Sequence, residues 1–495
     1  MIFSFFLPGD PRLMSIVPAF LYACLVVTAV LFVLASPSKT PERTPYPRLT
    51  GALFTGITLG AIPPPLLSYV GGDLLTGPNH ICTLLYLLFL LWLRAYDPDT
   101  DPSLSKSGVF RNVFHGIQPI SVILWSLLLI GDPFSVTIGV LPFLCVDFLL
   151  AWLERGTWSR FRRTLFTILL AVLFAKLFSV LTLLIGFHLA WKINTDFISL
   201  QDLPGHVGDV VKGLLDAYGG NVFGHSLVVA DTWVRLLRAL LLGATLVLSV
   251  RMFLNASSSG SRGRSEKLES LPLLISAIVL LDLLAVLASQ NAHNNGTVGV
   301  DRFLLPVAIF GTILLGNSFR DFLGSPGGDR IGKVFVGGVA ALGMIGAVAE
   351  CLGGWGMELV AFRENPSVPG VFRNILVNDQ AKVAAWLEEH GLQSGYAQYW
   401  NAQIVSVMTR GVVTVAPVKF SSGSFRPNPI FISSNTYLKM QEKRPVFLIT
   451  GAAGVNGVSR EKVLQVFGNP DEDQEIGRYH VLVWRKGIKL SLSSP

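Results

Sequence analysis

SRFRRTLFTILLAVLFAKLFSVLTLLIGFHLA, residues 159–190, joins a cluster of arginines to a long apolar run. The run from Thr164 to Ala190 contains one charged residue, Lys176, and is long enough to cross the ~30 Å hydrocarbon core of a bilayer as a helix. The whole chain is 51% hydrophobic and only 14% charged, whereas soluble proteins carry about 25% charged residues. The sequence therefore predicts a polytopic α-helical membrane protein.

Similar apolar stretches recur throughout residues 14–354, which we take as the transmembrane domain. We expect about ten spans, near residues 14–36, 50–70, 80–94, 114–130, 133–153, 164–190, 229–253, 270–289, 302–318 and 334–354. Pro63, Pro64 and Pro65 fall inside the second span and should break its helix. Neighbouring helices or water must then satisfy the freed backbone groups.

The basic residues between these spans alternate in abundance. Connectors after the odd-numbered spans hold seventeen: Lys39, Arg43, Arg48, Arg94, Lys106, Arg111, Arg155, Arg160, Arg162, Arg163, Arg251, Arg262, Arg264, Lys267, Arg320, Arg330 and Lys333. The other connectors hold four: Arg12, Lys192, Lys212 and Arg302. Because cytoplasmic loops are rich in Lys and Arg, we place the first set in the cytoplasm and the second outside. The chain after the tenth span is then outside as well.

The N-terminus also falls outside in this assignment, although no span precedes it. Residues 1–12, MIFSFFLPGDPR, have no basic n-region and no small-residue cleavage site, so they are not a signal peptide. This number of spans, with an external N-terminus, is what we expect of a chain that lacks one upstream helix. The alternative is that residues 1–13 are translocated to the outside as a short, weakly charged tail.

Residues 355–495 are expected to form a small extracytoplasmic α+β module. We expect helices at 379–392, closed by Gly391, and at 460–467, capped by Ser459, with strands at 402–408, 411–418, 445–450 and 478–485. Tyr396, Tyr399 and Trp400 either stack on a sugar ring or anchor the first strand to the helix before it. The glycine-rich stretch 451–457 lacks the Lys and Ser/Thr of a phosphate-binding loop, so a strand-to-helix turn is the better interpretation.

Two function classes are disfavoured by composition. The four cysteines lie in or beside apolar segments without CxxC spacing, which indicates core residues and not a metal site or disulfide framework. The formal charge of +7 is explained by the loop asymmetry, so no nucleic-acid partner is expected.

The connector at about 190–228 is the longest between spans, and its Val207, Val210, Val211, Leu214 and Leu215 recur at helical spacing. Either an amphipathic helix on the membrane surface or an ordinary capped loop helix fits this pattern.

Ionisable residues inside spans are functional candidates by default. Lys176 lies near the middle of the sixth span and needs a cavity or a partner, which Asp282 in the eighth span could provide. Asp231 and Arg235 can pair at i,i+4, or Arg235 and Arg238 can bind a lipid headgroup. We expect Asp147, near the cytoplasmic end of the fifth span, to form a structural ion pair.

The tight external connector GGDLLTGPNH places Asp73 close to His80 in sequence. A carboxylate and an imidazole there can serve as base and ligand in chemistry at the outer leaflet. The alternative is a capped helix start, with Asn79 as the N-cap.

Several of these features resemble the bacterial GT-C superfamily of polyprenyl-phosphate-sugar-dependent glycosyltransferases, relatives of protein mannosyltransferases and aminoarabinose transferases. Ile62–Leu66 (IPPPL) is similar to the Pro-Pro segment of an early span, and Arg302–Pro306 (RFLLP) to the Arg-Tyr-Leu-x-Pro entry of a late helix. The segment HGLQSGYAQYWNA from residue 390, with Phe467–Pro470 (FGNP), resembles the C-terminal module of many members.

The resemblance implies a multi-pass protein of the bacterial cytoplasmic membrane that transfers a sugar at its outer face. The implied partners are a polyprenyl-phosphate-linked sugar donor, a lipid, glycan or protein acceptor, and membrane lipids. Asp73 and His80 are then the catalytic candidates, and a divalent cation, Mg²⁺ or Mn²⁺, can assist. The candidates for substrate binding are Arg302, Arg235, Lys176, Asp301 and Asp10.

In the family the catalytic acids sit mainly in the loop after the first span, and this chain is expected to lack both that span and that loop. Asp10 would be the last remnant of the loop. Either the reading frame starts late, or the member is catalytically degenerate. Two other classes stay open: a transporter or flippase of a lipid-linked substrate, and a non-catalytic envelope scaffold.

Overall fold

The structure is a computed structural model that describes most of the chain, in two compact units. One unit consists of Met1–Val17, Lys176–Lys192 and Phe372–Pro495, and the other of Pro18–Ala175 and Ile193–Val371. We call the second the helical unit, and the part of the first from Phe372 onward the C-terminal unit. The described residues are 13–36, 46–61, 76–95, 108–132, 134–154, 158–184, 196–259, 270–290, 292, 300, 303–325, 330–364, 379–421, 423–428, 434–441, 443–451 and 459–490.

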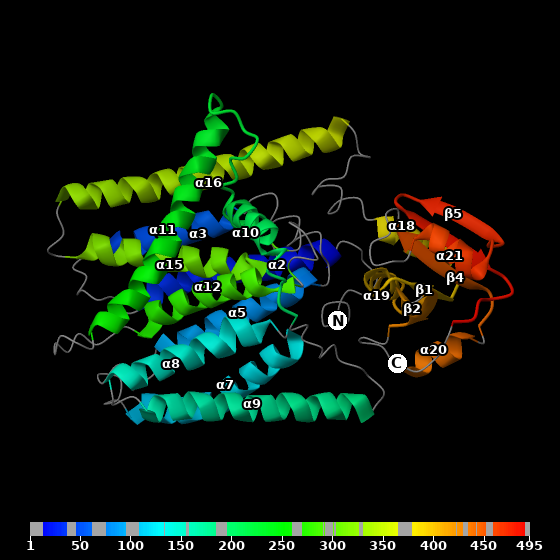
Figure 1. The fold of residues 1–495 in the computed structure, drawn as a ribbon, viewed down its shortest axis with the longest axis horizontal. Coiled ribbons are helices and arrows are strands. Elements are labelled where there is room, and N and C mark those ends of the chain that lie inside the picture. The colour runs from blue at the N-terminus through cyan, green and yellow to red at the C-terminus, as the bar shows by residue number, and fades with distance from the viewer. Residues whose placement is uncertain are drawn as a thin grey trace. The chain divides into compact units, whose positions relative to one another are not determined.

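Up to residue 364, every element longer than one residue that the structure describes is a helix (Figure 1). The helices are α2 (Leu13–Ala35), α3 (Tyr46–Gly60), α5 (Thr76–Ala95), α7 (Gly108–Gly131), the π-helical turn η1 (Val136–Val140), α8 (Leu141–Glu154), α9 (Trp158–Leu184), α10 (Leu203–Tyr218), α11 (Ala230–Ser259), α12 (Ser270–Ala288), α15 (Leu305–Gly324) and α16 (Arg330–Glu364). Each of the ten expected spans overlaps one of these helices, with η1 and α8 together overlapping the fifth. The triple proline 63–65 lies outside the described residues.

Six helical segments within the described ranges are long and apolar enough to cross a membrane, which indicates a membrane protein. They are Val17–Ala35, Val136–Leu153, Trp158–Leu184, Asp231–Asn255, Leu271–Ala288 and Arg330–Gly353. Two further apolar helices, His80–Arg94 and Pro119–Gly131, are shorter. The count of ten spans stays a prediction.

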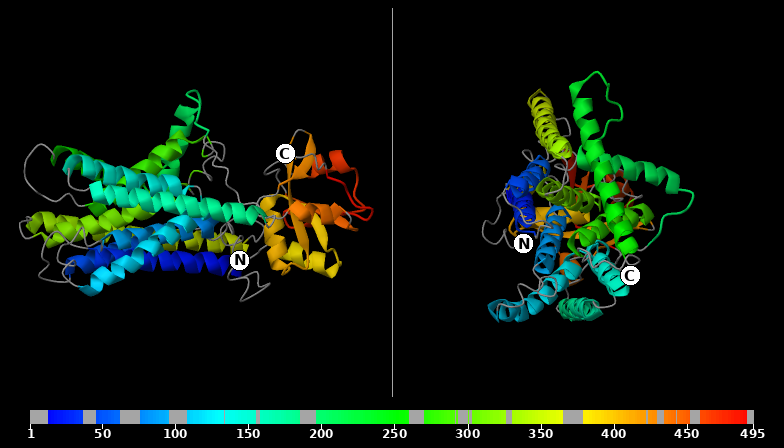
Figure 2. Two further views of the ribbon diagram at one scale, coloured as in Figure 1. Left: turned by 90° about the horizontal axis from the view of Figure 1, so that it is seen from below. Right: turned by 90° about the vertical axis from the view of Figure 1, so that its left-hand side faces the viewer.

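Helix α15 lies at the centre of the helical unit and is buried along most of its length. Its contact with α3 is close because two glycines face each other. A Cβ atom on Gly51 would come within 2.5 Å of the carbonyl oxygen of Gly316, and a Cβ on Gly316 would overlap Thr55 Oγ1. Small residues let helix backbones approach in this way, as is common in membrane helix pairs. Figure 2 shows the helices of this unit from the side and end-on.

The last turns of α2 and α15 meet at Arg320. Its guanidinium donates to the carbonyl oxygens of Val33 (3.0 Å) and Ser36 (2.9 Å), and to Asp321 Oδ1 (2.8 Å). The side chain is only 2% exposed. Because the last carbonyl groups of a helix have no partner inside it, Arg320 satisfies the C-terminal end of α2. Two connectors assigned to the cytoplasm by charge therefore begin at the same end of the helical unit.

Asp147 of α8 forms the structural ion pair that was expected of it. Its partner is Arg94 in the last turn of α5, and Thr164 Oγ1 of α9 donates to the second carboxylate oxygen at 2.6 Å. Asp147 is 1% exposed, so this network joins three helices with its charge neutralised.

The expected amphipathic helix is present as α10, and its buried face packs on the helical unit. His206 Nε2 lies 2.9 Å from the carbonyl oxygen of Val286 in α12. Tyr218 OH donates to the carbonyl oxygen of Val307 in α15 and to Thr245 Oγ1 in α11, at 3.2 and 3.3 Å. These contacts favour a loop helix that packs on the protein over a helix held by the membrane alone.

The C-terminal unit is a six-stranded mixed sheet with helices on both faces. The strand order is β3 (Ser424–Pro427), β2 (Thr414–Ser421), β1 (Ser394–Ala397), β4 (Val446–Gly451), β6 (Tyr479–Trp484) and β5 (Glu472–Ile476). Strand β1 pairs parallel with β2 and β4, and the other pairs are antiparallel. One face packs against α18 (Asp379–Glu389) and α19 (Tyr399–Met408), and the other against α20 (Ser434–Gln441) and α21 (Arg460–Phe467).

Most of the expected elements of this unit are confirmed, and one is wrong. Gly391 follows α18 with a φ of 64°, and Ser459 Oγ accepts from Lys462 N at the start of α21. The stretch 402–408, expected as a strand, is instead part of α19. The reason is topological, because parallel neighbours such as β1 and β2 need a crossover connection between them. The glycine-rich stretch 452–457 lies outside the described residues.

Two buried tyrosines of the C-terminal unit give a matched prediction. Tyr437 OH donates to the carbonyl oxygen of Pro417 at 2.5 Å and accepts from Asn428 N at 3.2 Å, whereas Tyr396 OH has no hydrogen-bond partner among the described residues. Tyr437→Phe should therefore lower the free energy of unfolding by about 1–3 kcal/mol. Tyr396→Phe should leave it unchanged or raise it. Hydrogen exchange of β1 and β4 in the intact protein measures both, and equal losses would refute the assignment.

Candidate functional site

His80 and Asp132 form a close pair at one end of the helical unit. His80 Nδ1 lies 2.6 Å from Asp132 Oδ2, and the two side chains are 12% and 8% exposed. His80 belongs to the first turns of α5, and Asp132 directly follows α7. The antiparallel run of α5 and α7 thus brings together two residues that are 52 positions apart in the sequence.

The backbone around Asp132 fixes the direction of its carboxylate. Asp132 Oδ1 accepts from Phe134 N at 3.0 Å, while the carbonyl oxygen of Asp132 accepts from Ser135 N at 3.0 Å. Ser135 Oγ donates back to the carbonyl oxygen of Leu128 at 3.2 Å. A short aspartate side chain that bonds the backbone two residues ahead is typical of a tight turn. The second carboxylate oxygen is thereby directed at His80.

Two phenylalanines flank the imidazole of His80. The ring of Phe134 stands edge-on to it at 6.2 Å between centroids, and the ring of Phe303, just before α15, at 6.5 Å. The two phenyl rings also contact each other, at 5.4 Å. An imidazole–carboxylate pair with apolar walls is partly shielded from water, so its electrostatic interactions are stronger than at an open surface.

This arrangement can perform acid–base chemistry. With its proton on Nδ1, the nitrogen next to the Asp132 carboxylate, the neutral imidazole carries its basic lone pair on Nε2. The carboxylate also stabilises the imidazolium that forms when Nε2 takes up a proton. His80 was a catalytic candidate from the sequence. Its partner Asp132 was not a catalytic candidate. The only signal for it in the sequence is that the predicted topology places it at the same end of the bundle as His80.

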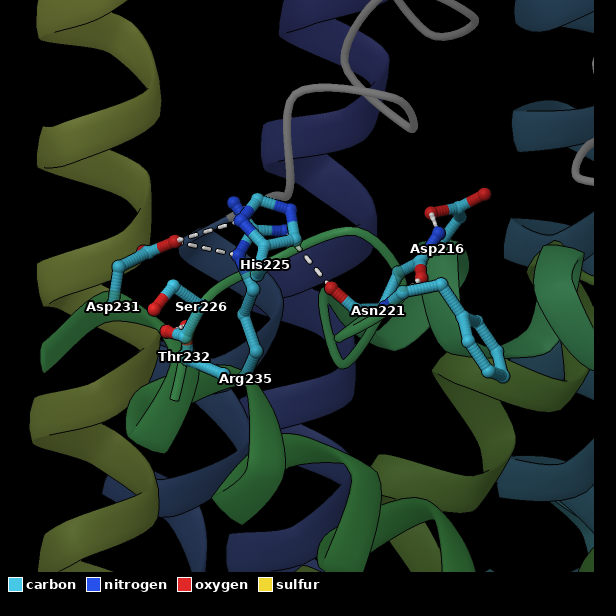
Figure 3. Close-up of polar contacts among 8 residues, drawn as sticks. Asp216, Asn221, His225, Ser226, Asp231, Thr232 and Arg235 are labelled. Atoms are coloured by element: carbon cyan, nitrogen blue, oxygen red, sulfur yellow. Dashed lines mark hydrogen bonds and ion pairs between the residues drawn. The ribbon is translucent and has the colours of Figure 1, made fainter. Parts of the chain in front are cut away.

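Arg235 and Asp231 pair as expected at i,i+4 in the first turns of α11, with Nε and Oδ2 2.7 Å apart (Figure 3). His225 Nδ1 lies 4.0 Å from the same carboxylate oxygen. Arg235 Nη1 also donates to the carbonyl oxygen of Asn221 at 3.5 Å. The structure thus places Arg235 in a cluster of the α10–α11 connection, with its charge balanced by Asp231.

Lys176 is exposed on α9, whereas Asp282 of α12 is fully buried. Neutralisation of Lys176 by Asp282 stays a prediction. Lys176 as a substrate-binding residue stays a prediction.

The other candidates from the sequence fall outside the described residues: Asp10, Asp73, Asp301 and Arg302. Arg302 directly precedes Phe303, which packs against His80. Within the described residues, no group of three or more His, Cys, Asp and Glu side chains is placed to hold a metal ion. The His80–Asp132 pair alone supplies two donors, so we derive no step through a divalent cation.

Comparison with known proteins adds no relative. No family model matches the chain, and neither a curated protein nor a solved structure matches it.

Proposed function

We propose that this chain is a GT-C-like membrane glycosyltransferase, which moves a sugar from a polyprenyl-phosphate donor to a hydroxyl acceptor at the outer face of the bacterial cytoplasmic membrane. The observation that carries the proposal is the His80–Asp132 pair, 2.6 Å apart and flanked by Phe134 and Phe303. The resemblance of the IPPPL and RFLLP segments to GT-C proteins supplies the class of donor.

In the proposed reaction the acceptor oxygen bonds to C1 of the sugar as the bond from C1 to the phosphate oxygen breaks. The electron pair of that bond leaves with the polyprenyl phosphate. His80 Nε2 takes the proton of the acceptor hydroxyl, and Asp132 stabilises the resulting imidazolium. Arg302, next in sequence to Phe303, is the cation we assign to the leaving phosphate.

Support for the location comes from the contacts at the two ends of the helical unit. Arg320 joins the ends of α2 and α15, which precede connectors rich in Lys and Arg. His80, Asp132 and Phe303 meet where connectors poor in basic residues begin or end. If the basic connectors are cytoplasmic, the His80 end faces outward, where outer-leaflet donors are available.

The test is an assay of purified protein in liposomes with radiolabelled polyprenyl-phosphate sugars in the outer leaflet. We expect release of polyprenyl phosphate that depends on an added hydroxyl acceptor. A flippase would release no polyprenyl phosphate and would instead move the intact donor to the other leaflet. A scaffold would leave the donor both intact and in place. Either of those results would refute the proposal.

A second candidate, a proton-coupled transporter, is favoured by one observation in α12. Asp282 is 0% exposed, and neither carboxylate oxygen has a hydrogen bond of ordinary geometry, although the N–H of Val307 lies nearby. Buried intramembrane carboxyl groups often carry protons in transporters. Donor movement between leaflets that follows a pH gradient and is lost in Asp282→Asn would favour this candidate over transfer.

A further inference from the structure

The connection between α10 and α11 turns large apolar side chains outward. Val228 is 93% exposed, Leu227 68%, Phe223 65% and Trp233 60%. All four lie within eleven residues, which we call the 223–233 segment. Figure 1 shows this connection projecting at the end of α11. Single exposed apolar residues are ordinary, but a contiguous patch marks an interaction surface.

Several polar groups of the same region bond to each other (Figure 3). Asn221 Nδ2 donates to Asp216 Oδ1 at 2.7 Å, and Thr232 Oγ1 donates to the carbonyl oxygen of Ser226 at 2.6 Å. The indole N–H of Trp233 donates to the carbonyl oxygen of Leu227 at 3.0 Å. Each bond removes a polar group that a loop in water would offer to the solvent.

The charges at the base of the segment are also compensated locally. Asp231 Oδ2 lies 2.7 Å from Arg235 Nε and 4.0 Å from His225 Nδ1. A charge held in an ion pair is less costly to remove from water than an isolated one. The side chains of Asp231 and His225 are 37% and 42% exposed, but their charges are held in the cluster. Exposed apolar groups beside polar groups that bond to each other suit a medium with few hydrogen-bond partners.

The apolar patch continues along α11. Helix α11 contains the candidate span Asp231–Asn255, and its exposed apolar side chains run on from Trp233 through Leu240 and Val247 to Leu254. A helix that spans a bilayer faces acyl chains with such a surface. Since the 223–233 segment adjoins the first residues of this span, its patch is continuous with the lipid-facing side of α11. Trp233 stands where aromatic residues are enriched, at the membrane–water boundary.

We propose that the 223–233 segment is embedded in the outer boundary of the bilayer, with Phe223, Leu227, Val228 and Trp233 among the lipid acyl chains. This inference goes beyond the proposed function and does not depend on it. The membrane-contacting element is therefore this loop, while α10 packs on the protein through His206 and Tyr218. The occupant of the patch is lipid, and not a second protein.

The test uses a nitroxide label on Val228→Cys in the full-length protein, reconstituted in phosphatidylethanolamine–phosphatidylglycerol nanodiscs. The four native cysteines, Cys24, Cys82, Cys145 and Cys351, are free and are first replaced by alanine. Val228 is 93% exposed, so the label should not disturb folding. We expect collisions with apolar oxygen to exceed collisions with a water-soluble nickel chelate several-fold.

The matched control is Val412→Cys in the C-terminal unit, also an exposed valine, at 59%. We expect its label to collide more with the nickel chelate than with oxygen. If position 228 behaves like position 412, the segment lies in water and the proposal fails. If position 228 is shielded from both reagents, a protein surface covers it and the proposal fails as well.

Discussion

Asp132→Asn is expected to lower the rate of sugar transfer about 100-fold or more, because the amide cannot stabilise an imidazolium at His80. In the structure the carboxylate lies 2.6 Å from His80 Nδ1 and is oriented by Phe134 N. Asparagine preserves the size of the side chain and can still accept from Phe134 N, so the turn after α7 should remain. The measurement is the initial rate of polyprenyl-phosphate release in liposomes, together with the thermal midpoint of the purified variant.

Two further variants sharpen this test. His80→Gln should lose a similar share of the rate, and the double variant should lose little more, because the two residues act as a unit. Asp209→Asn removes one negative charge from α10 and should retain the wild-type rate. Wild-type activity in Asp132→Asn would remove the pair from the mechanism.

Arg320→Leu is expected to destabilise the helical unit by about 3–5 kcal/mol, the usual cost of removing one partner from a buried ion pair. The change leaves the carbonyl oxygens of Val33 and Ser36 and the carboxylate of Asp321 without the guanidinium that now binds them. We expect the thermal midpoint in detergent to fall by about 5 °C or more. Fluorescence-detected size exclusion after heating measures it.

Arg330→Leu is the matched control for Arg320→Leu. Arg330 also carries a positive charge in the connector region after α15, but its side chain is exposed at the start of α16. Removing an exposed charge should change stability by less than about 1 kcal/mol. Equal effects of the two substitutions would show that Arg320 acts through net charge and not through its buried hydrogen bonds.

Arg320 also illustrates what sequence patterns can and cannot predict. The pattern of basic residues correctly grouped the ends of α2 and α15, because loop charge follows topology. It counted Arg320 as a loop charge, whereas the structure buries this side chain in the last turns of α15. Spacing along one helix does not indicate which carbonyl groups of another helix lie within reach.

The candidate site was only partly predicted, because the sequence does not indicate which helices pack side by side. His80 was selected because it shares a tight external connector with Asp73, which lies outside the described residues. Asp132 is the partner that the structure provides, through the packing of α5 beside α7. In the C-terminal unit, the apolar stretch 402–408 fitted a strand by composition. The parallel pairing of β1 and β2 made it a crossover helix.

The orientation of the His80 end is the central claim, because transfer from outer-leaflet donors requires it to face outward. Single cysteines at Lys212 and Arg330 test it, in a background without the native cysteines. Both side chains are exposed. Lys212 belongs to α10, which Tyr218 joins to the first turn of α15. Arg330 starts α16, and residues 325–330 are too few to return along α15, which is about 30 Å long.

The measurement is labelling of intact cells with a membrane-impermeant maleimide, before and after permeabilisation. The account predicts that Lys212→Cys is labelled in intact cells, and that Arg330→Cys is labelled only after the membrane is opened. Labelling of Arg330→Cys but not of Lys212→Cys in intact cells would contradict the account, since the His80–Asp132 pair would then face the cytoplasm.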